Sequence, residues 1–586
     1  MIEDPAAAEE TDEVHESRPP LAVDYHVCDP QLGPKSPLRS WLKGIGISRS
    51  RRGGSRYVPY RCFPRTRELD NDTRAAIREL EETPRVYHGA VAARLLERRY
   101  GIACPCAFAD VRMCADLLEF YPFELKDLIS SCIRPVPGFP ARRHAERARD
   151  HSAIILALFL DWNDRIYREN LDAVYDIEHS VIEPIVRMIE DGLLLDAERL
   201  EEGLSALNRQ AHAARERAQE AVGRWFSPSR PADVRAVLYE RLGLEAAQGM
   251  NDRHSEIDRH KLRRLANQDS TGVATLLLDC EEAMMMARRA GSIFIANYQW
   301  NGRIHPDIDT LGSPTGGFTC SDPDLQAVPP ALLGAFVAPR GCLLLEAKFS
   351  QLELRVLAHF SQDKNLLAAF SDPGAGVDVH RRTAAAALAK AEEQVSEQER
   401  NRIGMAINRG VASGQNDAWL ADALEILPER ANQFMGRFFA RYSRVRHWID
   451  AVEKAAETDG EARSLYGRRR TIAGLGAWER AGYSRAPRWA AHHIISATVA
   501  DITKLSIARL YDALPEGCRL LLPLADGVLM EVPQGRVKEI AKLVRQTMEE
   551  PPTDFSVPLR VKLSRGKTWA DCKGRPQRVE QDSNPS

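Results

Sequence analysis

The sequence lacks any apolar run near the roughly 18 residues that a membrane-spanning helix needs. It also lacks an excess of charge of one sign. Eighty Lys and Arg face 83 Asp and Glu, so no global positive field draws the chain to nucleic acid or anionic lipid. Any such binding must come from local patches. Residues 1–20 carry seven acids and one arginine, which is the wrong charge for a secretory signal, and we expect an intracellular protein.

Cysteine at metal-binding spacing is missing as well. The 11 cysteines are scattered, and the close pair Cys104 and Cys106 has no second pair at zinc-ligand spacing. We therefore expect reduced thiols and no structural metal. The 44% hydrophobic and 28% charged fractions are ordinary for a globular protein and exclude disordered, collagenous and coiled-coil classes. At roughly 150 residues per domain, 586 residues predict three or four compact units.

Periodicity divides the chain into regions. Residues 1–20 and 576–586 are polar and predict disordered tails. Between 21 and 173, short strand-like runs alternate with helical stretches, which is typical of an α/β fold. Between 174 and 300 the pattern is helical, and from 301 to 575 strands and helices alternate again. The strands expected are 44–48, 56–59, 342–347, 519–524 and 528–532, and the helices 71–80, 88–98, 151–167, 352–360, 397–412, 431–458 and 490–514.

Five segments in order carry a family resemblance. They are Thr315-Gly-Gly-Phe-Thr-Cys-Ser-Asp-Pro-Asp-Leu-Gln326, Ser350-Gln-Leu-Glu-Leu-Arg355, Ala406-Ile-Asn-Arg-Gly410, Gly467-Arg-Arg-Arg470 and Ala525-Asp-Gly527. Together they resemble the family A DNA polymerases, the group of bacterial DNA polymerase I, over about residues 300–570. The resemblance implies an α/β multidomain fold: a degenerate 3′–5′ exonuclease-like domain (21–173), then a right-hand polymerase with a helical thumb (174–300), palm and fingers (301–575).

The resemblance also implies a damaged metal site. Nucleotidyl transfer uses two divalent ions about 4 Å apart, held by hard carboxylate oxygens. The position of the family's first metal-binding aspartate is Lys348, whose ammonium accepts no hydrogen bond and repels magnesium. The second aspartate is retained as Asp526. We therefore expect Lys348 to replace the cation and to form an ion pair with Asp526. One alternative is a register shift that offers Glu346, two residues before Lys348 on the same strand face, to a metal.

The triphosphate-binding helix is altered in the same way. The family places an Arg, a Lys, an aromatic and a Tyr at four-residue steps on one helical face. The matching positions here are Asn401, Met405, Arg409 and Ser413. Glu353 is retained, and in the family it excludes ribonucleotides. It is equally interpreted as a helix carboxylate paired with an arginine.

Nucleic-acid contact is expected from an arginine cluster. Residues 463–488 hold seven arginines and one acid, which resembles a surface that follows phosphates, although a solvated arginine face gives the same pattern. The residues implied in DNA contact are Gln326, Arg402, Arg468, Arg469, Arg470, Arg485 and Arg488.

The N-terminal region retains few of the carboxylates that exonuclease chemistry needs. Asp24 matches the first position, but its partner reads His26. A second acidic position reads Ala93, and Asp150 matches the last one. A purely structural domain is therefore favoured there.

Three functions remain open from the sequence. The first is a polymerase-like protein of replication or repair that binds primer-template DNA and has lost nucleotidyl transfer and proofreading. The second is an active DNA-directed polymerase with an altered metal site. The third is a protein-interaction subunit that binds replication or repair proteins and does not bind DNA. No cofactor is expected, and Mg²⁺ is required only by the active alternative.

Overall fold

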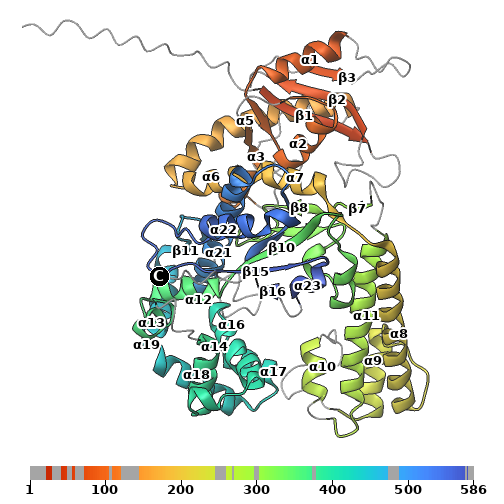
Figure 1. Ribbon diagram of the computed structural model, residues 1–586, viewed down its shortest axis with the longest axis vertical. Helices are drawn as coiled ribbons and strands as arrows, with labels where there is room; N and C mark the ends of the chain where they lie inside the picture. The colour runs from red at the N-terminus through yellow and green to blue at the C-terminus, as the bar shows by residue number, and fades with distance from the viewer. Residues whose placement is uncertain are drawn as a thin grey trace, which may run out of the picture. The chain divides into compact units, whose positions relative to one another are not determined.

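The computed structural model describes residues 21–28, 41–48, 56–59, 71–103, 108–120, 144–244, 259–266, 269–295, 302–371, 378–472, 488–573 and 577–578. The chain forms two compact units, residues 1–169 and 170–586 (Figure 1). The predicted N-terminal tail lies outside the described residues. None of the helices that the structure describes has the length and apolar character to cross a membrane.

The first unit contains a five-stranded sheet in the order β3-β2-β1-β4-β5. Strands β1 to β3 are antiparallel, and β4 and β5 join in parallel. Helix α5 packs on β1 and β2. The elements are β1 (Leu21–Cys28), β2 (Trp41–Ser48), β3 (Arg56–Pro59), α1 (Asn71–Glu81), β4 (Arg85–Tyr87), α2 (Ala90–Arg99), β5 (Phe108–Asp110), α3 (Val111–Leu117) and α5 (His144–Arg168).

A buried charge cluster ties β4 to α2 in this unit. The Glu97 carboxylate accepts hydrogen bonds from Arg85 Nη1 at 2.5 Å, Tyr87 Oη at 2.6 Å and Arg94 Nη1 at 2.5 Å. Arg85 also donates to the backbone oxygens of Leu80 and Ala103. The buried carboxylate is therefore satisfied within the protein, as a buried charge must be.

The second unit is built on a central sheet, which we define as β13-β14-β10-β15-β16, all antiparallel. Its strands are β10 (Cys342–Phe349), β13 (Arg519–Leu524), β14 (Gly527–Pro533), β15 (Val561–Gly566) and β16 (Gln577–Arg578). Helices α21 (Arg488–Ala513) and α22 (Val537–Met548) pack against β14. The prediction of a disordered tail from residue 576 is wrong for Gln577 and Arg578, because their backbones pair with β15.

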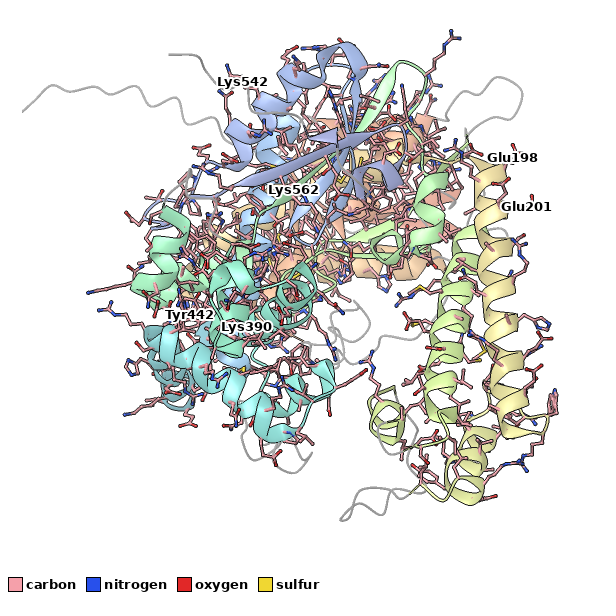
Figure 2. The ribbon with its side chains drawn as sticks, turned by 60° about the horizontal axis from the view of Figure 1, so that its bottom comes forward. Glu198, Glu201, Lys390, Tyr442, Lys542 and Lys562 are labelled. Atoms are coloured by element: carbon pink, nitrogen blue, oxygen red, sulfur yellow. The ribbon has the colours of Figure 1, made fainter. Side chains whose placement is uncertain are left out.

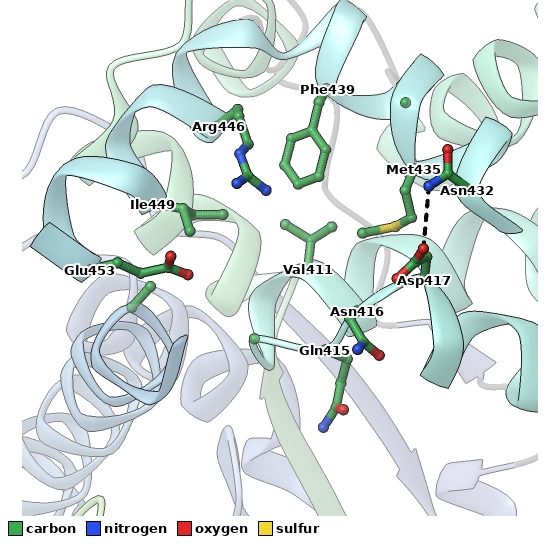
Figure 3. A pocket seen from close by; sticks show the side chains of 13 residues that line it. Val411, Gln415, Asn416, Asp417, Asn432, Met435, Phe439, Arg446, Ile449 and Glu453 are labelled. Carbon is green, nitrogen blue, oxygen red and sulfur yellow. Dashed lines mark hydrogen bonds between the residues drawn. The ribbon is translucent and has the colours of Figure 1, made fainter. Parts of the chain in front are cut away.

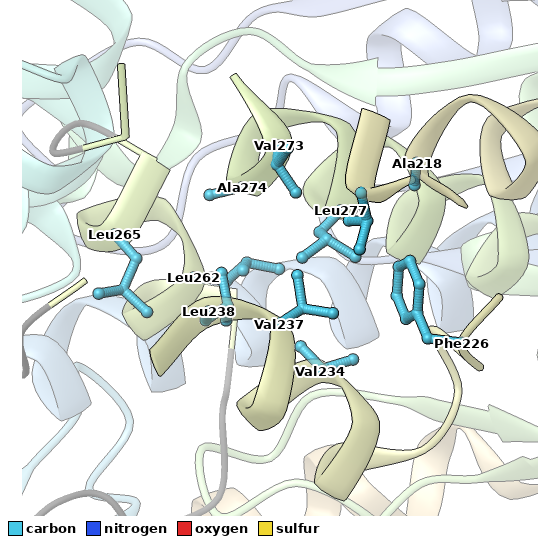
Figure 4. Packing of buried hydrophobic residues seen from close by; sticks show 11 residues of the cluster. Ala218, Phe226, Val234, Val237, Leu238, Leu262, Leu265, Val273, Ala274 and Leu277 are labelled. Carbon is cyan, nitrogen blue, oxygen red and sulfur yellow. The ribbon is translucent and has the colours of Figure 1, made fainter. Parts of the chain in front are cut away.

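A helical arm precedes the sheet. It comprises α8 (Ala197–Val222), α9 (Pro231–Arg235), the π-helix η1 (Ala236–Arg241), α10 (Arg259–Ala266) and α11 (Val273–Ile295). Helices α8 and α11 run side by side (Figure 1). One face of α8 buries Leu200, Leu207, Ala214, Ala218 and Val222. Figure 4 shows how Val237, Leu238 and Leu277 close the apolar core at the arm's end.

A helical layer follows β10: α12 (Leu352–Ser361), α13 (Lys364–Ser371), α14 (Val379–Leu388), α15 (Glu397–Glu399), the π-helix η6 (Arg400–Gly404), α16 (Met405–Ala412), α17 (Asp417–Leu424), α18 (Pro428–Arg441) and α19 (Ser443–Asp459). The helix expected over 397–412 is present, with a π-helical turn inside it. The single helix expected over 431–458 is wrong. It breaks at Tyr442, whose φ of −115° and ψ of 61° are not helical.

The remaining elements connect these parts. They are α6 (Asp172–Ser180), α7 (Ile182–Asp191), β6 (Leu193–Leu194), β7 (Arg303–Ile304), β8 (Asp307–Asp309), β9 (Thr319–Ser321), the 3₁₀ turns η3 (Leu325–Ala327), η4 (Pro330–Ala335), η5 (Glu392–Gln394) and η7 (Gln534–Arg536), β11 (Glu461–Arg463), β12 (Arg469–Thr471) and α23 (Trp569–Lys573). Strands β11 and β12 form a hairpin that leads into α21.

Candidate functional site

The central sheet brings Lys348 and Asp526 together. Lys348 lies near the end of β10 opposite Gly527, the first residue of β14, and Asp526 occupies the turn between β13 and β14. Lys348 Nζ is 3.0 Å from Asp526 Oδ1, at ion-pair distance but without the alignment of a hydrogen bond. The predicted contact is therefore present. The side chains are 39% and 32% exposed, and such a partly solvated pair contributes about 1 kcal/mol or less to stability.

Gly527 lets the two strands meet at this point. A Cβ atom built on Gly527 would lie 2.0 Å from the Ala347 carbonyl oxygen and 2.8 Å from Lys348 Cα. Both are backbone atoms of β10, so a side chain at residue 527 requires the strands to move apart. The close packing of β14 on β10 therefore favours glycine at residue 527.

Gly527→Ala is expected to lower the free energy of unfolding by about 1–3 kcal/mol, because the added methyl group overpacks two backbones. Urea unfolding followed by circular dichroism would measure the change. Gly535→Ala is the matched control, since no atom lies within 4 Å of its built Cβ. Equal stability of the two variants would contradict the steric argument.

Glu353 lies close enough to Arg409 and Asp526 for their charges to affect its pKa. Glu353 lies in the first turn of α12, and its side chain is exposed. Desolvation by the surrounding protein raises the pKa of the Glu353 carboxyl, Arg409 opposes the shift and Asp526 adds to it. Arg409 therefore acts on Glu353 electrostatically, and both roles expected for Glu353 stay predictions.

The substituted helical face is open to solvent. Asn401, Met405 and Arg409 are exposed, and Ser413 caps the end of α16. The Asn401 side-chain oxygen accepts a hydrogen bond from Arg400 Nη1 at 2.6 Å. The roles expected for these residues in nucleotide contact stay predictions.

Glu346 is occupied by the protein itself. Its carboxylate is 6% exposed and accepts hydrogen bonds from Trp569 Nε1 at 2.8 Å and Lys573 Nζ at 2.9 Å, both from α23. Both oxygens of Glu346 thus have partners within the protein, so the alternative in which Glu346 serves a metal requires these contacts to rearrange.

The arginine cluster divides into buried and accessible members. Arg468 is 3% exposed, so its predicted contact with nucleic acid is wrong. Its guanidinium donates to Asp501 Oδ1 at 2.6 Å and to Glu178 Oε1 at 2.5 Å. Lys504, also buried, donates to Glu178 and to the Thr310 carbonyl oxygen. Two cations and two carboxylates thus form a neutral buried network, which we call the Arg468 network.

Gly316 packs against the guanidinium of Arg468. It has a φ of +76°, which favours glycine, and a Cβ built there would lie 2.5 Å from Arg468 Cζ. The first of the five sequence segments therefore packs directly on a guanidinium of the fourth.

The structure describes some of the other residues predicted to contact nucleic acid. Arg469 and Arg470 are half-buried on β12. Gln326 is exposed and donates to the Pro523 carbonyl oxygen at 3.2 Å, and Arg402 donates to that of Leu424 at 2.7 Å. Arg485 and the side chain of Arg488 lie outside the described residues.

The first unit holds the predicted exonuclease remnants at separate elements. Asp24 and His26 lie on β1 and Asp150 on α5, but their side chains are outside the described part of the chain. Ala93 is buried in α2. The start of α2 is satisfied by Asp110, whose carboxylate accepts from the Gly89 and Ala90 amides at 2.8 and 2.7 Å. Over the residues that the structure describes, no three His, Cys, Asp or Glu side chains gather as metal ligands.

Lys562 is a residue that the sequence analysis missed. Strand β15 pairs with β10 so that Lys562 lies directly opposite Lys348. Its neighbours Val561 and Leu563 are buried and Lys562 is exposed. This alternation is visible in the sequence and could have identified the position as a strand residue pointing out of the core.

A cavity of about 300 Å³ lies beside the end of α16, among α17, α18 and α19 (Figure 3). Val411, Met435, Phe439 and Ile449 supply its apolar wall. Asn432 Nδ2 donates to Asp417 Oδ2 at 3.3 Å on its polar side. None of the predicted catalytic residues lines this cavity, so it is separate from the site on the central sheet.

Comparisons with known proteins agree with this architecture. The model of DNA polymerase family A matches residues 197–571. The chain is 28% identical over 488 residues to the thermostable DNA polymerase I of Thermus thermophilus, covering 78% of this chain and 56% of that protein. It is 30% identical over 499 residues to DNA polymerase I of Chloroflexus aurantiacus, covering 82% and 51%. The chain spans about half the length of these relatives.

A solved structure shows the same fold. It is the POL domain of Pol1 from M. smegmatis in complex with DNA primer-template and dNTP, with a TM-score of 0.83 and 24% sequence identity over 95% of this chain and 96% of that one. The fold, with its central sheet, helical arm and helical layer, is that of a polymerase domain. Because the family model covers well over half of the sequence, this chain belongs to DNA polymerase family A.

Proposed function

We propose that this chain binds primer-template DNA in replication or repair and does not catalyse nucleotidyl transfer. The observation that supports the proposal is the ion pair between Lys348 and Asp526 on the central sheet. An ammonium group stands where the chemistry needs a second carboxylate, and it is already in contact with the first.

The residues at this site do not fit a pair of magnesium ions. Metal-assisted phosphoryl transfer needs carboxylate oxygens on two ions roughly 4 Å apart. Here Lys348 repels a divalent ion, and Glu346 is held by Trp569 and Lys573. Asp526 and Glu353 remain, but their charge is balanced by Lys348 and Arg409.

The helical face above the sheet is equally unsuited to a triphosphate. Asn401 and Met405 are neutral and exposed, so Arg409 alone offers a positive charge at the four matched positions. A triphosphate needs several cations to offset its charge, and one arginine provides a single bidentate partner.

Two kinds of observation support DNA binding. The family's relatives are DNA polymerases, and the similar solved structure contains DNA primer-template. In this chain, Arg402 is exposed, and Arg469 and Arg470 are half-buried on the β11–β12 hairpin. We further propose that the first unit is an exonuclease-like domain without proofreading activity, because His26 and Ala93 stand at two of its carboxylate positions.

The purified chain is expected to bind a primer-template duplex without extending the primer. Affinity should fall steeply with salt, since phosphate contacts release counterions and log K falls by about 0.9 per contact per log unit of salt. Fluorescence anisotropy from low to physiological salt would measure binding. Gel analysis of a labelled primer with dNTPs and Mg²⁺ or Mn²⁺ would measure extension.

An Arg469→Ala/Arg470→Ala variant should reduce the salt slope by up to about 2, one unit for each lost phosphate contact. Lys542→Ala, an exposed change on α22 (Figure 2), is the matched control. Template-dependent extension by the pure chain would establish the active alternative instead. Failure to bind any duplex would favour the protein-interaction alternative.

A further inference from the structure

The central sheet places two lysines side by side, one of which contacts Asp526. Lys348 on β10 and Lys562 on β15 are directly opposite in the antiparallel register. Side chains in such a pair share one face of the sheet, with Cβ atoms about 4.5–5.5 Å apart. Like charges in this arrangement repel each other, so the pair needs a neighbouring anion. Lys562 is labelled on its strand in Figure 2.

Asp526 serves as that anion for Lys348 but leaves positive charge uncompensated. Its Oδ1 contacts Lys348 Nζ at 3.0 Å, and Lys562 has no ion pair within the described ranges. Arg409 acts electrostatically on Glu353, so the charges linked to this site are the cations Lys348, Lys562 and Arg409 and the carboxylates Asp526 and Glu353. The site therefore carries a surplus positive charge, whereas a metal site of the family would carry negative charge.

A phosphate monoester is the ligand that suits this arrangement. It carries about −1.5 to −2 charges near neutral pH, more than the single charge of a phosphodiester, and accepts several hydrogen bonds. Two ammonium groups offer six donors and need no bridging metal. The partial exposure of Lys348 and Asp526 allows a ligand to reach them, and the ion pair is weak enough to exchange for a phosphate.

We propose that Lys348 and Lys562 form a metal-independent binding site for the terminal phosphate of a DNA strand, with Asp526 as the counter-ion that the phosphate displaces. This inference rests on the proposed DNA binding and adds a preference for one kind of strand end. The chemistry is the same for a 3′- and a 5′-phosphate, so the experiment must compare the two.

The test is a binding measurement in EDTA with three otherwise identical recessed duplexes. The recessed strand ends in a hydroxyl, a 3′-phosphate or a 5′-phosphate. A duplex with a phosphate at one of these ends is expected to bind about tenfold more tightly than the hydroxyl duplex, equivalent to about 1.4 kcal/mol. Anisotropy titrations at one fixed ionic strength give the ratio of Kd values.

Three variants separate this site from general electrostatics. Lys562→Gln should bring the ratio of Kd values close to one, whereas Lys542→Gln on α22 should leave it unchanged. Asp526→Asn should strengthen binding of the phosphorylated duplex severalfold, because it removes the anion that competes for Lys348. A metal-ligating role for Asp526 makes no such prediction in EDTA.

The outcomes are distinguishable from those of the proposed function. Equal affinity for all three duplexes, or an unchanged ratio in Lys562→Gln, would overturn the phosphate site and leave DNA binding intact. Absence of binding to any duplex would overturn both.

Discussion

Replacing Arg468 with alanine is expected to lower the free energy of unfolding of the second unit by about 3–5 kcal/mol, because it leaves two buried carboxylates without their shared partner. Asp501 and Glu178 are both 0% exposed at their side chains, and Arg468 joins them with a single guanidinium. Only Lys504 would remain as a cation in the Arg468 network, and it contacts Glu178.

The remaining partners cannot repair the network. Burial lowers the pKa of the Lys504 ammonium, and Glu178 opposes that shift. Asp501 would keep one hydrogen bond, from Ser464 Oγ at 2.9 Å. A hydroxyl does not neutralise a buried carboxylate, so the cost of the uncompensated charge falls on folding.

Urea unfolding monitored by circular dichroism would measure the effect of Arg468→Ala. Arg446→Ala is the matched control, since its pair with Asp450 is about half exposed and contributes roughly 0.5 kcal/mol or less. A loss of less than about 1 kcal/mol in Arg468→Ala would show that water or rearrangement satisfies both carboxylates.

Because Arg468 is part of this buried network, it should not be included in a mutational test of DNA binding by the arginine cluster. Neutralising Arg468, Arg469 and Arg470 together would confuse loss of phosphate contacts with loss of the folded state. Of these three arginines, Arg469 and Arg470 are half-buried rather than buried, so they are the two whose substitution tests DNA contact.

Sequence patterns predicted the strands that carry the site, and the family resemblance implied which of them pair. The strand expected over 519–524 is β13, and the strand expected over 342–347 forms most of β10. Adjacent antiparallel strands then place Lys348 near Asp526, and the predicted ion pair is present. Local periodicity is sufficient to predict each strand, whereas the pairing of β10 with β14, which are far apart in the sequence, was implied by the family resemblance.

Other parts depend on contacts between residues far apart in the chain. A run of three arginines does not indicate which of them is buried. Arg468 is the buried one because it bonds to Glu178, which lies 290 residues away in the sequence. The sequence correctly predicts that Glu346 lies on the same strand as Lys348. It does not predict the partners of Glu346 in α23, because these lie far away in the sequence. Tyr442 breaks a helix without a glycine or proline, and its buried ring contacts Phe438, a tertiary contact that helical periodicity does not report.

The second large effect is expected from Lys348→Asp, which should create a binding site for a divalent ion without creating polymerase activity. The change places a carboxylate opposite Gly527, beside Asp526 and near Glu353. Carboxylate oxygens are suitable ligands for Mn²⁺ and Mg²⁺. At a Mn²⁺ concentration of ten times Kd, ligand binding stabilises the folded state by about 1.4 kcal/mol.

Thermal unfolding with and without Mn²⁺ would measure this gain as a rise in Tm that wild type lacks. Lys562→Gln is the matched control, because it removes a positive charge at the same place without adding an oxygen ligand. A similar Mn²⁺ response in both variants would mean that lower positive charge alone accounts for it. Equal responses of Lys348→Asp and wild type would contradict the view that Lys348 excludes the metal.

Primer extension by Lys348→Asp should stay undetectable even where Mn²⁺ binds. A metal pair positions and neutralises phosphates only when the protein also holds the triphosphate, and Asn401 and Met405 offer no charge to it. Metal binding and catalysis are thus separate losses in this chain, one on the central sheet and one on the helix of η6 and α16. Strong extension by the single variant would show that the helical substitutions matter less than the ammonium at residue 348.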